Sequence, residues 1–215
     1  EGDGKGGWHP VWEASMNGHC GVVEWLLGEV GATAEAVNPD TGTNAVLMAA
    51  QNGHLEVLLV LVKAGASMDR GTMPMGRGIT PIFAAAQHGH LEVVRMLVEA
   101  GADISICMMG NGWSPLLVAA WSGHAAVVAE LLQHGADRLI ATAQEHLNIP
   151  AGSTALSVAQ LKGYQDVVGL LSHGKKFAVV GLSSANGRLI WMAVGVAACC
   201  AILALALGKS KRTGP

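Results

Sequence analysis

The chain contains 215 residues, of which 51% are hydrophobic and 13% are charged, and its formal net charge is −3. A chain of this length and apolar content can bury a core, so general disorder is not expected. Lys and Arg cluster only near the C-terminus, at Lys209, Lys211 and Arg212. Because no basic stripe is visible, nucleic acid is not expected to be a partner.

Residues 1–8 are rich in glycine and are predicted to form an extended N-terminal segment. The first residue is Glu1 rather than Met, which indicates either a fragment or a chain from which a presequence was removed. The second interpretation favours a protein imported into an organelle.

A Gly-His pair recurs through residues 9–173, and four of its histidines are 35, 36 and 34 residues apart. The copies are Gly18-His19, Gly53-His54, Gly89-His90 and Gly123-His124, with Gly163-Tyr164 as a variant. Small residues precede each pair and two apolar pairs follow it. In the first four copies those apolar pairs are four residues apart, which places them on one helical face. The pattern predicts a helix, a glycine turn and an antiparallel helix, repeated about five times.

Two copies also carry a helix-start signal, at Thr80-Pro81 and Ser114-Pro115. Thr or Ser caps the first helix, and Pro fits its first turn. Together with the Gly-His pairs, these residues make the chain resemble the ankyrin-repeat family over residues 9–173. The resemblance implies an all-α solenoid of about five helix-turn-helix repeats that binds protein partners through its concave face.

The chain departs from the family at one position of the first helix, where the family usually has His after Thr-Pro-Leu. The residues that replace it are Trp12, Leu47, Phe83, Leu117 and Ser157. The hydrogen bonds of that His should therefore be missing, with apolar packing in their place. The fifth repeat should be the weakest, because Gly169 interrupts its second helix and Ser172 replaces a Leu.

The resemblance also implies which positions contact a partner, namely those that flank the motif glycine or follow the alanine pair. The predicted contact residues are Arg77, Ile79, Gln87 and His88 in the third repeat and Asn111, Trp113, Trp121 and Ser122 in the fourth, with Thr43, Gln51 and Asn52 in the second. Tryptophan is enriched at interface hot spots. The alternative is that one tryptophan packs against the adjacent finger, the extended loop between repeats. The long connections 69–78 and 137–152 are predicted to be functional.

No catalytic motif is recognisable, so the chain is predicted not to be an enzyme and to need no cofactor. The repeat histidines stand at equivalent turns about 10 Å apart, too far to share a metal ion. The four cysteines form no Cys-x-x-Cys pair, which fits a reducing compartment.

Residues 189–207 contain no charged side chain and, as a helix, would span about 28 Å. We therefore predict a linker at 174–188, a single transmembrane helix at 189–208 and a basic tail at 209–215. Trp191 would anchor the interface, and Ala193, Gly195, Ala197 and Cys199 would pack against other transmembrane helices. The alternative is a buried helix in a soluble assembly.

Three functional hypotheses follow. The first is an accessory subunit of a membrane complex, with its repeats on a reducing face (cytosol, stroma or matrix). An organellar membrane is favoured, such as that of a photosynthetic or respiratory complex. The second is a tail-anchored adaptor that recruits soluble partners transiently, and the third is a fragment of an enzyme whose catalytic part is absent.

Overall fold

The computed structural model describes residues 9–35, 37–38, 42–72, 78–108, 110–172, 177–183 and 189–195. The chain divides into two compact units, Glu1–Leu171 and Ser172–Pro215.

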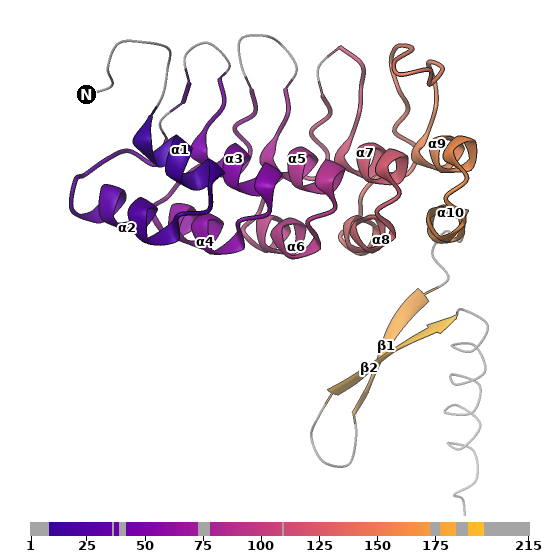
Figure 1. Ribbon diagram of the computed structural model, residues 1–215. Coiled ribbons are helices and arrows are strands. Elements are labelled where there is room, and N and C mark those ends of the chain that lie inside the picture. Colours follow the sequence, from indigo (N-terminus) through magenta and orange to yellow (C-terminus); the bar gives the residue numbers. More distant parts are fainter. Residues whose placement is uncertain are drawn as a thin grey trace, which may run out of the picture. The chain divides into compact units, whose positions relative to one another are not determined.

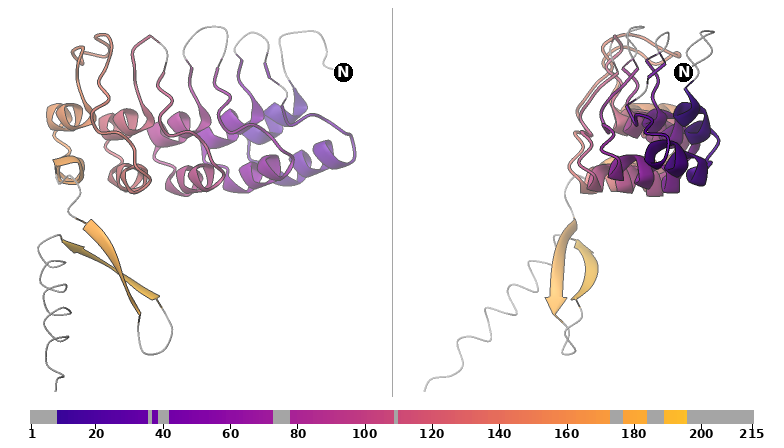
Figure 2. Two further views of the ribbon diagram at one scale, coloured as in Figure 1. Left: turned by 180° about the vertical axis from the view of Figure 1, so that it is seen from behind. Right: turned by 90° about the vertical axis from the view of Figure 1, so that its left-hand side faces the viewer.

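Ten helices lie between residues 10 and 172 of the described chain, in five consecutive pairs (Figure 1). They are α1 (Pro10–Met16), α2 (Cys20–Gly28), α3 (Ala45–Asn52), α4 (Leu55–Lys63), α5 (Pro81–His88), α6 (Leu91–Glu99), α7 (Pro115–Ser122), α8 (Ala125–Gln133), α9 (Ala155–Lys162) and α10 (Gln165–Ser172). The odd-numbered helices form one row and the even-numbered helices a second row, with the fingers projecting beyond the odd-numbered row (Figures 1 and 2). The first unit is the all-α solenoid that the sequence predicts.

Side-chain caps and glycines set the ends of the odd-numbered helices. The side chain of Thr80 accepts a hydrogen bond from the backbone amide of Phe83, and that of Ser114 accepts one from Leu117. At the other end, Gly89 and Gly123 adopt left-handed conformations with φ of 77° and 80°. Glycine adopts this conformation without the steric cost that a Cβ atom brings.

The Gly-His pairs join one repeat to the next. The Nε2 atoms of His54, His90 and His124 lie 3.0 Å from the carbonyl oxygens of Met16, Gln51 and Gln87, one repeat earlier, so each Nε2–H donates across the interface. Each ring also lies against the preceding motif glycine: a Cβ atom at Gly89 would be 2.6 Å from Nδ1 of His124. We call the pairs Gly18/His54, Gly53/His90 and Gly89/His124 the Gly-His ladder. Through these contacts the repeat histidines hold one repeat against the next.

At the position where the chain departs from the family, the middle repeats show the expected apolar packing. Leu47, Phe83 and Leu117 are buried. In the first repeat, the indole Nε1–H of Trp12 donates to Oγ1 of Thr43 at 3.2 Å. In the fifth, the Ser157 side chain completes a capping box by accepting a hydrogen bond from the amide of Thr154.

The fifth repeat differs from the expectation of a weak, interrupted unit. Helix α10 runs without a break from Gln165 to Ser172, through Gly169. The exposed polar residues of α9 and α10 include Ser157, Gln160 and Ser172, at positions where the inner repeats carry apolar residues. Terminal repeats of a solenoid need a polar outer face. The polar substitutions from which the sequence predicts a weak fifth repeat are therefore typical of a capping repeat.

In the second unit, β1 (Phe177–Ser183) and β2 (Leu189–Gly195) form an antiparallel pair in which Phe177 stands opposite Gly195 and Ser183 opposite Leu189. The predicted linker 174–188 therefore contains a strand, and the first seven residues of the predicted helix 189–208 form another strand instead of a helix. Both strands are rich in β-branched and large apolar residues, and the sequence between them contains Asn186-Gly187, a dipeptide typical of hairpins.

Among the helices that the structure describes, none is both long and apolar enough to cross a bilayer. Trp191, Ala193 and Gly195, predicted to pack in a membrane, lie on β2. Ala197, Cys199 and the tail 209–215 are outside the described residues.

Candidate functional site

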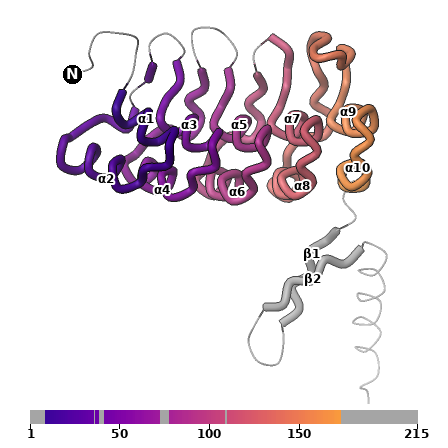
Figure 3. Tube along the Cα trace, viewed as in Figure 1, coloured from indigo at the N-terminus to yellow at the C-terminus, as the bar shows by residue number. Residues whose placement is uncertain are grey.

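The two residues before each motif glycine form a strip across the repeats. Because these helices pack side by side (Figures 1 and 3), equivalent residues of successive repeats become neighbours. We call this surface the inner-helix strip. It consists of Met16, Asn17, Gln51, Asn52, Gln87, His88, Trp121, Ser122, Leu161 and Lys162. All ten are exposed or half-buried, although the alanines that precede Gln51, Gln87 and Trp121 are fully buried.

Neither of the two rows of the strip contains Asp or Glu. Its first three repeats contribute mainly amides and its last two contribute Trp121, Leu161 and Lys162. Some of the amides are held in place locally: Nδ2 of Asn52 donates to the carbonyl oxygen of Met48 at 2.9 Å. Side chains of this kind can hydrogen-bond a partner without a charge of their own.

Six predicted contact residues lie on the strip: Gln51, Asn52, Gln87, His88, Trp121 and Ser122. Nδ1–H of His88 donates to the carbonyl oxygen of Ala84 in its own helix, at 3.0 Å, and the residue remains exposed. Ile79 is half-buried against the hydrophobic core. Arg77 is outside the described residues.

Trp113 is a buried residue and not a surface contact, which corrects its predicted role. Only 2% of it is exposed. Its ring meets Trp121 and His146 edge-on, with centroids 5.8 Å away in both cases. The alternative prediction, that one tryptophan packs against the adjacent finger, therefore holds for Trp113. The physical reason is that the fifth finger crosses over the position where the family pattern implies exposure.

Asn111 serves the fold of its own finger. Its side-chain Oδ1 accepts a hydrogen bond from the amide of Trp113 at 3.2 Å. Its carbonyl oxygen accepts another from the amide of Ala143 in the next finger, at 2.8 Å. These bonds tie the fourth and fifth fingers together beside Trp113.

Trp121, by contrast, is half-buried and is part of the strip. Nζ of Lys162 lies 4.7 Å from the centroid of its ring, a cation–π contact. Among the described residues, neither Nε1 of Trp121 nor Nε1 of Trp113 has a hydrogen-bond partner, although both atoms are buried. Buried donors without a partner are uncommon, and each needs a physical explanation, such as strain, a function or a bound water.

The fifth finger ends in a tight turn that the sequence does not reveal. His146 and Ile149 exchange backbone hydrogen bonds of 3.1 and 2.9 Å, and the two residues between them, Leu147 and Asn148, have φ of 53° and 62°. Such a turn favours Asn and Gly, so Leu147 is strained there. The Leu147 residue is nevertheless 55% exposed, and Leu139 in the same finger is 81% exposed. The long connection 137–152 is the only sequence signal for this feature.

On the opposite side of the helix pairs, Arg95 bridges two repeats. Its guanidinium donates to Glu130 of the next repeat at 3.2 Å and to Glu92 at 3.0 Å, and these carboxylates raise the pKa of Arg95. Glu130 is itself buried. This ion pair belongs to the contact between repeats and not to the strip.

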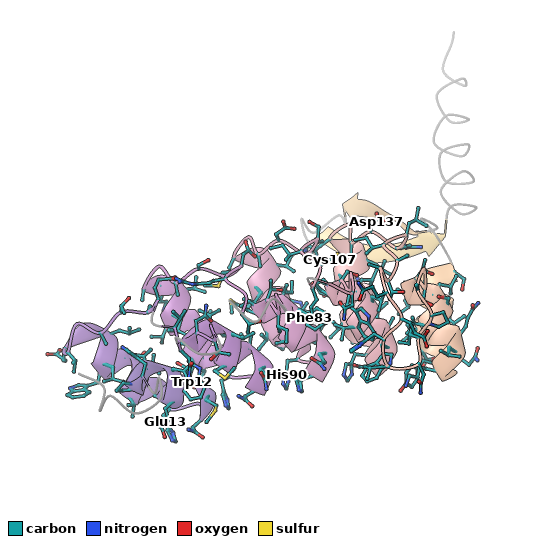
Figure 4. All side chains as sticks on the ribbon, turned by 90° about the horizontal axis from the view of Figure 1, so that it is seen from above. Trp12, Glu13, Phe83, His90, Cys107 and Asp137 are labelled. Carbon is teal, nitrogen blue, oxygen red and sulfur yellow. The ribbon has the colours of Figure 1, made fainter. Side chains whose placement is uncertain are left out.

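Three other groups have shifted pKa values. Hydrogen bonds from the side chain and amide of Ser105 lower the pKa of Asp103. Burial raises the pKa of the Cys107 thiol, and the same cause raises that of Cys20. Both thiols therefore stay protonated near neutral pH, where a reactive cysteine would be a thiolate. Figure 4 places Cys107 and Asp137 along the edge of the stack opposite Trp12 and His90.

In the part of the chain that the structure describes, no three His, Cys, Asp or Glu side chains gather closely enough to hold a metal ion. The inner-helix strip and the fifth finger are two exposed features of this described part. Paired helices, glycine turns and a strip of variable side chains define a class of repeat protein with a surface for recognition.

A family model described as ankyrin repeats (3 copies) matches residues 11–108 and again residues 72–142. The chain therefore belongs to the ankyrin-repeat family. No curated protein matches it.

Proposed function

We propose that this protein is a non-enzymatic scaffold that binds protein partners through the inner-helix strip. The observation that carries the proposal is the division of labour within the odd-numbered helices. Their alanines and leucines are buried between repeats, whereas the two residues before each motif glycine are left accessible and differ from repeat to repeat. A rigid surface whose side chains vary while its backbone repeats is suited to selective recognition.

The surface that would bind is centred on Gln87, His88, Trp121 and Ser122. An aromatic ring next to amides offers a large apolar contact together with hydrogen-bonding groups, a combination enriched at interface hot spots. The membership of this chain in the ankyrin family supports the same role, because the concave face formed by these helices is where the family binds proteins.

The test compares two substitutions of the same kind on opposite faces. Gln87→Arg places a bulky charge in the strip, and Gln133→Arg places the same charge at the exposed end of α8. The full chain and both variants are immobilised, incubated with extract from the native source and examined by quantitative mass spectrometry. We expect a partner that the parent chain and Gln133→Arg retain and that Gln87→Arg loses. A chain that retains no partner, or partners lost equally from both variants, would contradict the proposal.

A separate proposal concerns residues 189–207. We propose that this segment attaches the protein to a membrane, because it is 19 residues long without a charge. Strand β2 is incompatible with a helix that begins at Leu189, so the proposal covers attachment and not a helical span from that residue. Both membership of an organellar membrane complex and action as an anchored adaptor would require such attachment.

Flotation with liposomes tests the attachment. The full chain should rise with the vesicles in a density gradient, and a chain that ends at residue 172 should stay at the bottom. If both chains stay at the bottom, the segment does not attach the protein to lipid. A sizing column in mild detergent then distinguishes a stable subunit, which elutes within a larger complex, from a transient adaptor, which elutes alone.

A further inference from the structure

The fourth and fifth repeats carry a patch whose chemistry differs from that of the rest of the strip. We call it the repeat-five patch: Trp121, Leu161, Lys162, His146 and Leu147. Leu161 and Lys162 end α9, Trp121 lies on the neighbouring helix α7, and the other two residues form the tip of the fifth finger. The contacts Lys162–Trp121, Trp121–Trp113 and Trp113–His146 connect these elements through one continuous cluster.

The apolar part of the patch is large and accessible. Leu161 is 63% exposed although its neighbours Val158 and Ala159 are buried. At the corresponding positions of the second and third repeats stand Gln51 and Gln87. Leu147 remains exposed despite a backbone conformation that disfavours leucine. Isolated exposed leucines are common, but these two directly adjoin Lys162 and His146 in the chain, the two residues that contact the tryptophan pair. They therefore offer a surface that suits an apolar side chain.

The charge of the patch is positive. Lys162 has no carboxylate partner among the described residues, in contrast to Arg70 and Arg95, which bond Glu35, Glu92 and Glu130. Its ammonium group lies over the face of the Trp121 ring. Since neither row of the strip contains Asp or Glu, a carboxylate placed here would meet no acidic side chain of the strip.

The indole nitrogens point to the same kind of ligand. Nε1 of Trp121 is a donor without an acceptor among the described residues, and it belongs to the ring that Lys162 covers. A ligand that draws Lys162 toward its own carboxylate would uncover this ring and could offer an oxygen to the indole N–H.

We propose that the repeat-five patch binds an extended acidic peptide, in which apolar side chains alternate with carboxylates. The apolar side chains lie on Leu161, Leu147 and the ring of Trp121, and a carboxylate pairs with Lys162. The inference rests on the proposed function, since it names the chemistry of the partner at one end of the inner-helix strip.

The test uses the full chain and three fluorescein-labelled heptapeptides that alternate leucine with glutamate, with glutamine or with lysine. Binding is followed by fluorescence anisotropy at low and high salt. We expect the glutamate peptide to bind about two- to fivefold more tightly than the glutamine peptide at low salt, the range for one exposed ion pair, with the difference shrinking as salt rises. The lysine peptide should bind most weakly.

Two lysine variants assign the charge. Lys162→Gln should remove the preference for glutamate and leave the affinity for the glutamine peptide unchanged. Lys63→Gln, a matched change at the exposed end of α4, should leave the preference intact. In indole ¹H–¹⁵N spectra, the signal assigned to Trp121 by a Trp121→Phe variant should shift when the glutamate peptide is added.

Equal affinity for the glutamate and glutamine peptides would overturn the inference, as would a preference that survives in Lys162→Gln or failure of all three peptides to bind. Such results leave the proposed function standing if the extract experiment still finds a partner that Gln87→Arg loses. Conversely, peptide binding with the expected preference would support the patch even if that experiment recovered nothing.

Discussion

In α5, the carbonyl oxygen of Gln87 bonds His124 of the next repeat, whereas the side chain of the same residue belongs to the inner-helix strip. In the Gly-His ladder, each histidine contacts a backbone carbonyl group and a motif glycine of the preceding repeat. These two groups must be the same in every repeat. The strip uses side chains that the ladder does not touch. Comparison of these two regions suggests that residues one or two positions apart serve stability and recognition independently.

The largest expected effect is on the ladder. Gly89→Ala should destabilise the protein through a left-handed alanine, which costs about 1–2 kcal/mol, and through collision of its Cβ atom with the His124 ring, which adds roughly 1–3 kcal/mol. Gly65→Ala is the control, since Gly65 has φ of 80° and no described atom within 4 Å of the new Cβ position. Urea titration should show the smaller loss for Gly65→Ala. Equal losses would mean that the ring contact contributes nothing.

The next effect isolates the hydrogen bond of the ladder. His90→Ala removes the donor to the carbonyl oxygen of Gln51 and should lower the free energy of unfolding by about 1–3 kcal/mol. His19→Ala, at the equivalent but exposed position of the first repeat, should cost less than about 0.5 kcal/mol. Thermal unfolding of the two variants checks this. If His19→Ala were as harmful as His90→Ala, the histidine would act within its own repeat.

A third prediction compares an inner repeat with the first one. Val93 is 2% exposed, and Val22 at the equivalent position is 48% exposed. Val93→Ala removes two buried methyl groups, worth about 1.6 kcal/mol, and Val22→Ala should change stability by less than about 0.5 kcal/mol. Chemical denaturation measures both. A large loss for Val22→Ala would show that something covers the first repeat.

The smallest effect has the opposite sign. Leu147→Asn should stabilise the protein by roughly 1 kcal/mol, because asparagine tolerates the left-handed conformation that strains leucine. Leu139→Asn is the control in the same finger, where the backbone is not left-handed. If the repeat-five patch binds as proposed, Leu147→Asn should also weaken peptide binding. A variant that is less stable than the parent would contradict the argument from strain.

Much of the fold could be predicted because the residues that form the ladder can be recognised in the sequence. Gly-His pairs at a regular period can be recognised without any knowledge of neighbours in space. The strip could be predicted in part for the same reason, since Gln87, His88, Trp121 and Ser122 occupy fixed places before the motif glycine. These positions depend on local helix geometry alone.

Other features depend on contacts between distant residues and could not be predicted. The burial of Trp113 depends on the path of the fifth finger and on His146, more than thirty residues later. From the sequence, the polar residues of the fifth repeat suggest an unstable repeat. The structure shows that α10 is the last helix of the described chain, where a polar outer face is expected. For residues 189–195, an apolar run of this length fits a strand or part of a helix equally well, and only the pairing with 177–183 decides between them.

The most direct test of the central claim measures partner capture and urea unfolding on the same preparation of Gln87→Arg. The account predicts that capture is lost while the free energy of unfolding stays within about 0.5 kcal/mol of the parent value, because the ladder uses only the backbone of Gln87. Retained capture would contradict the binding role of the strip. Loss of stability in parallel with capture would contradict the separation of the two regions.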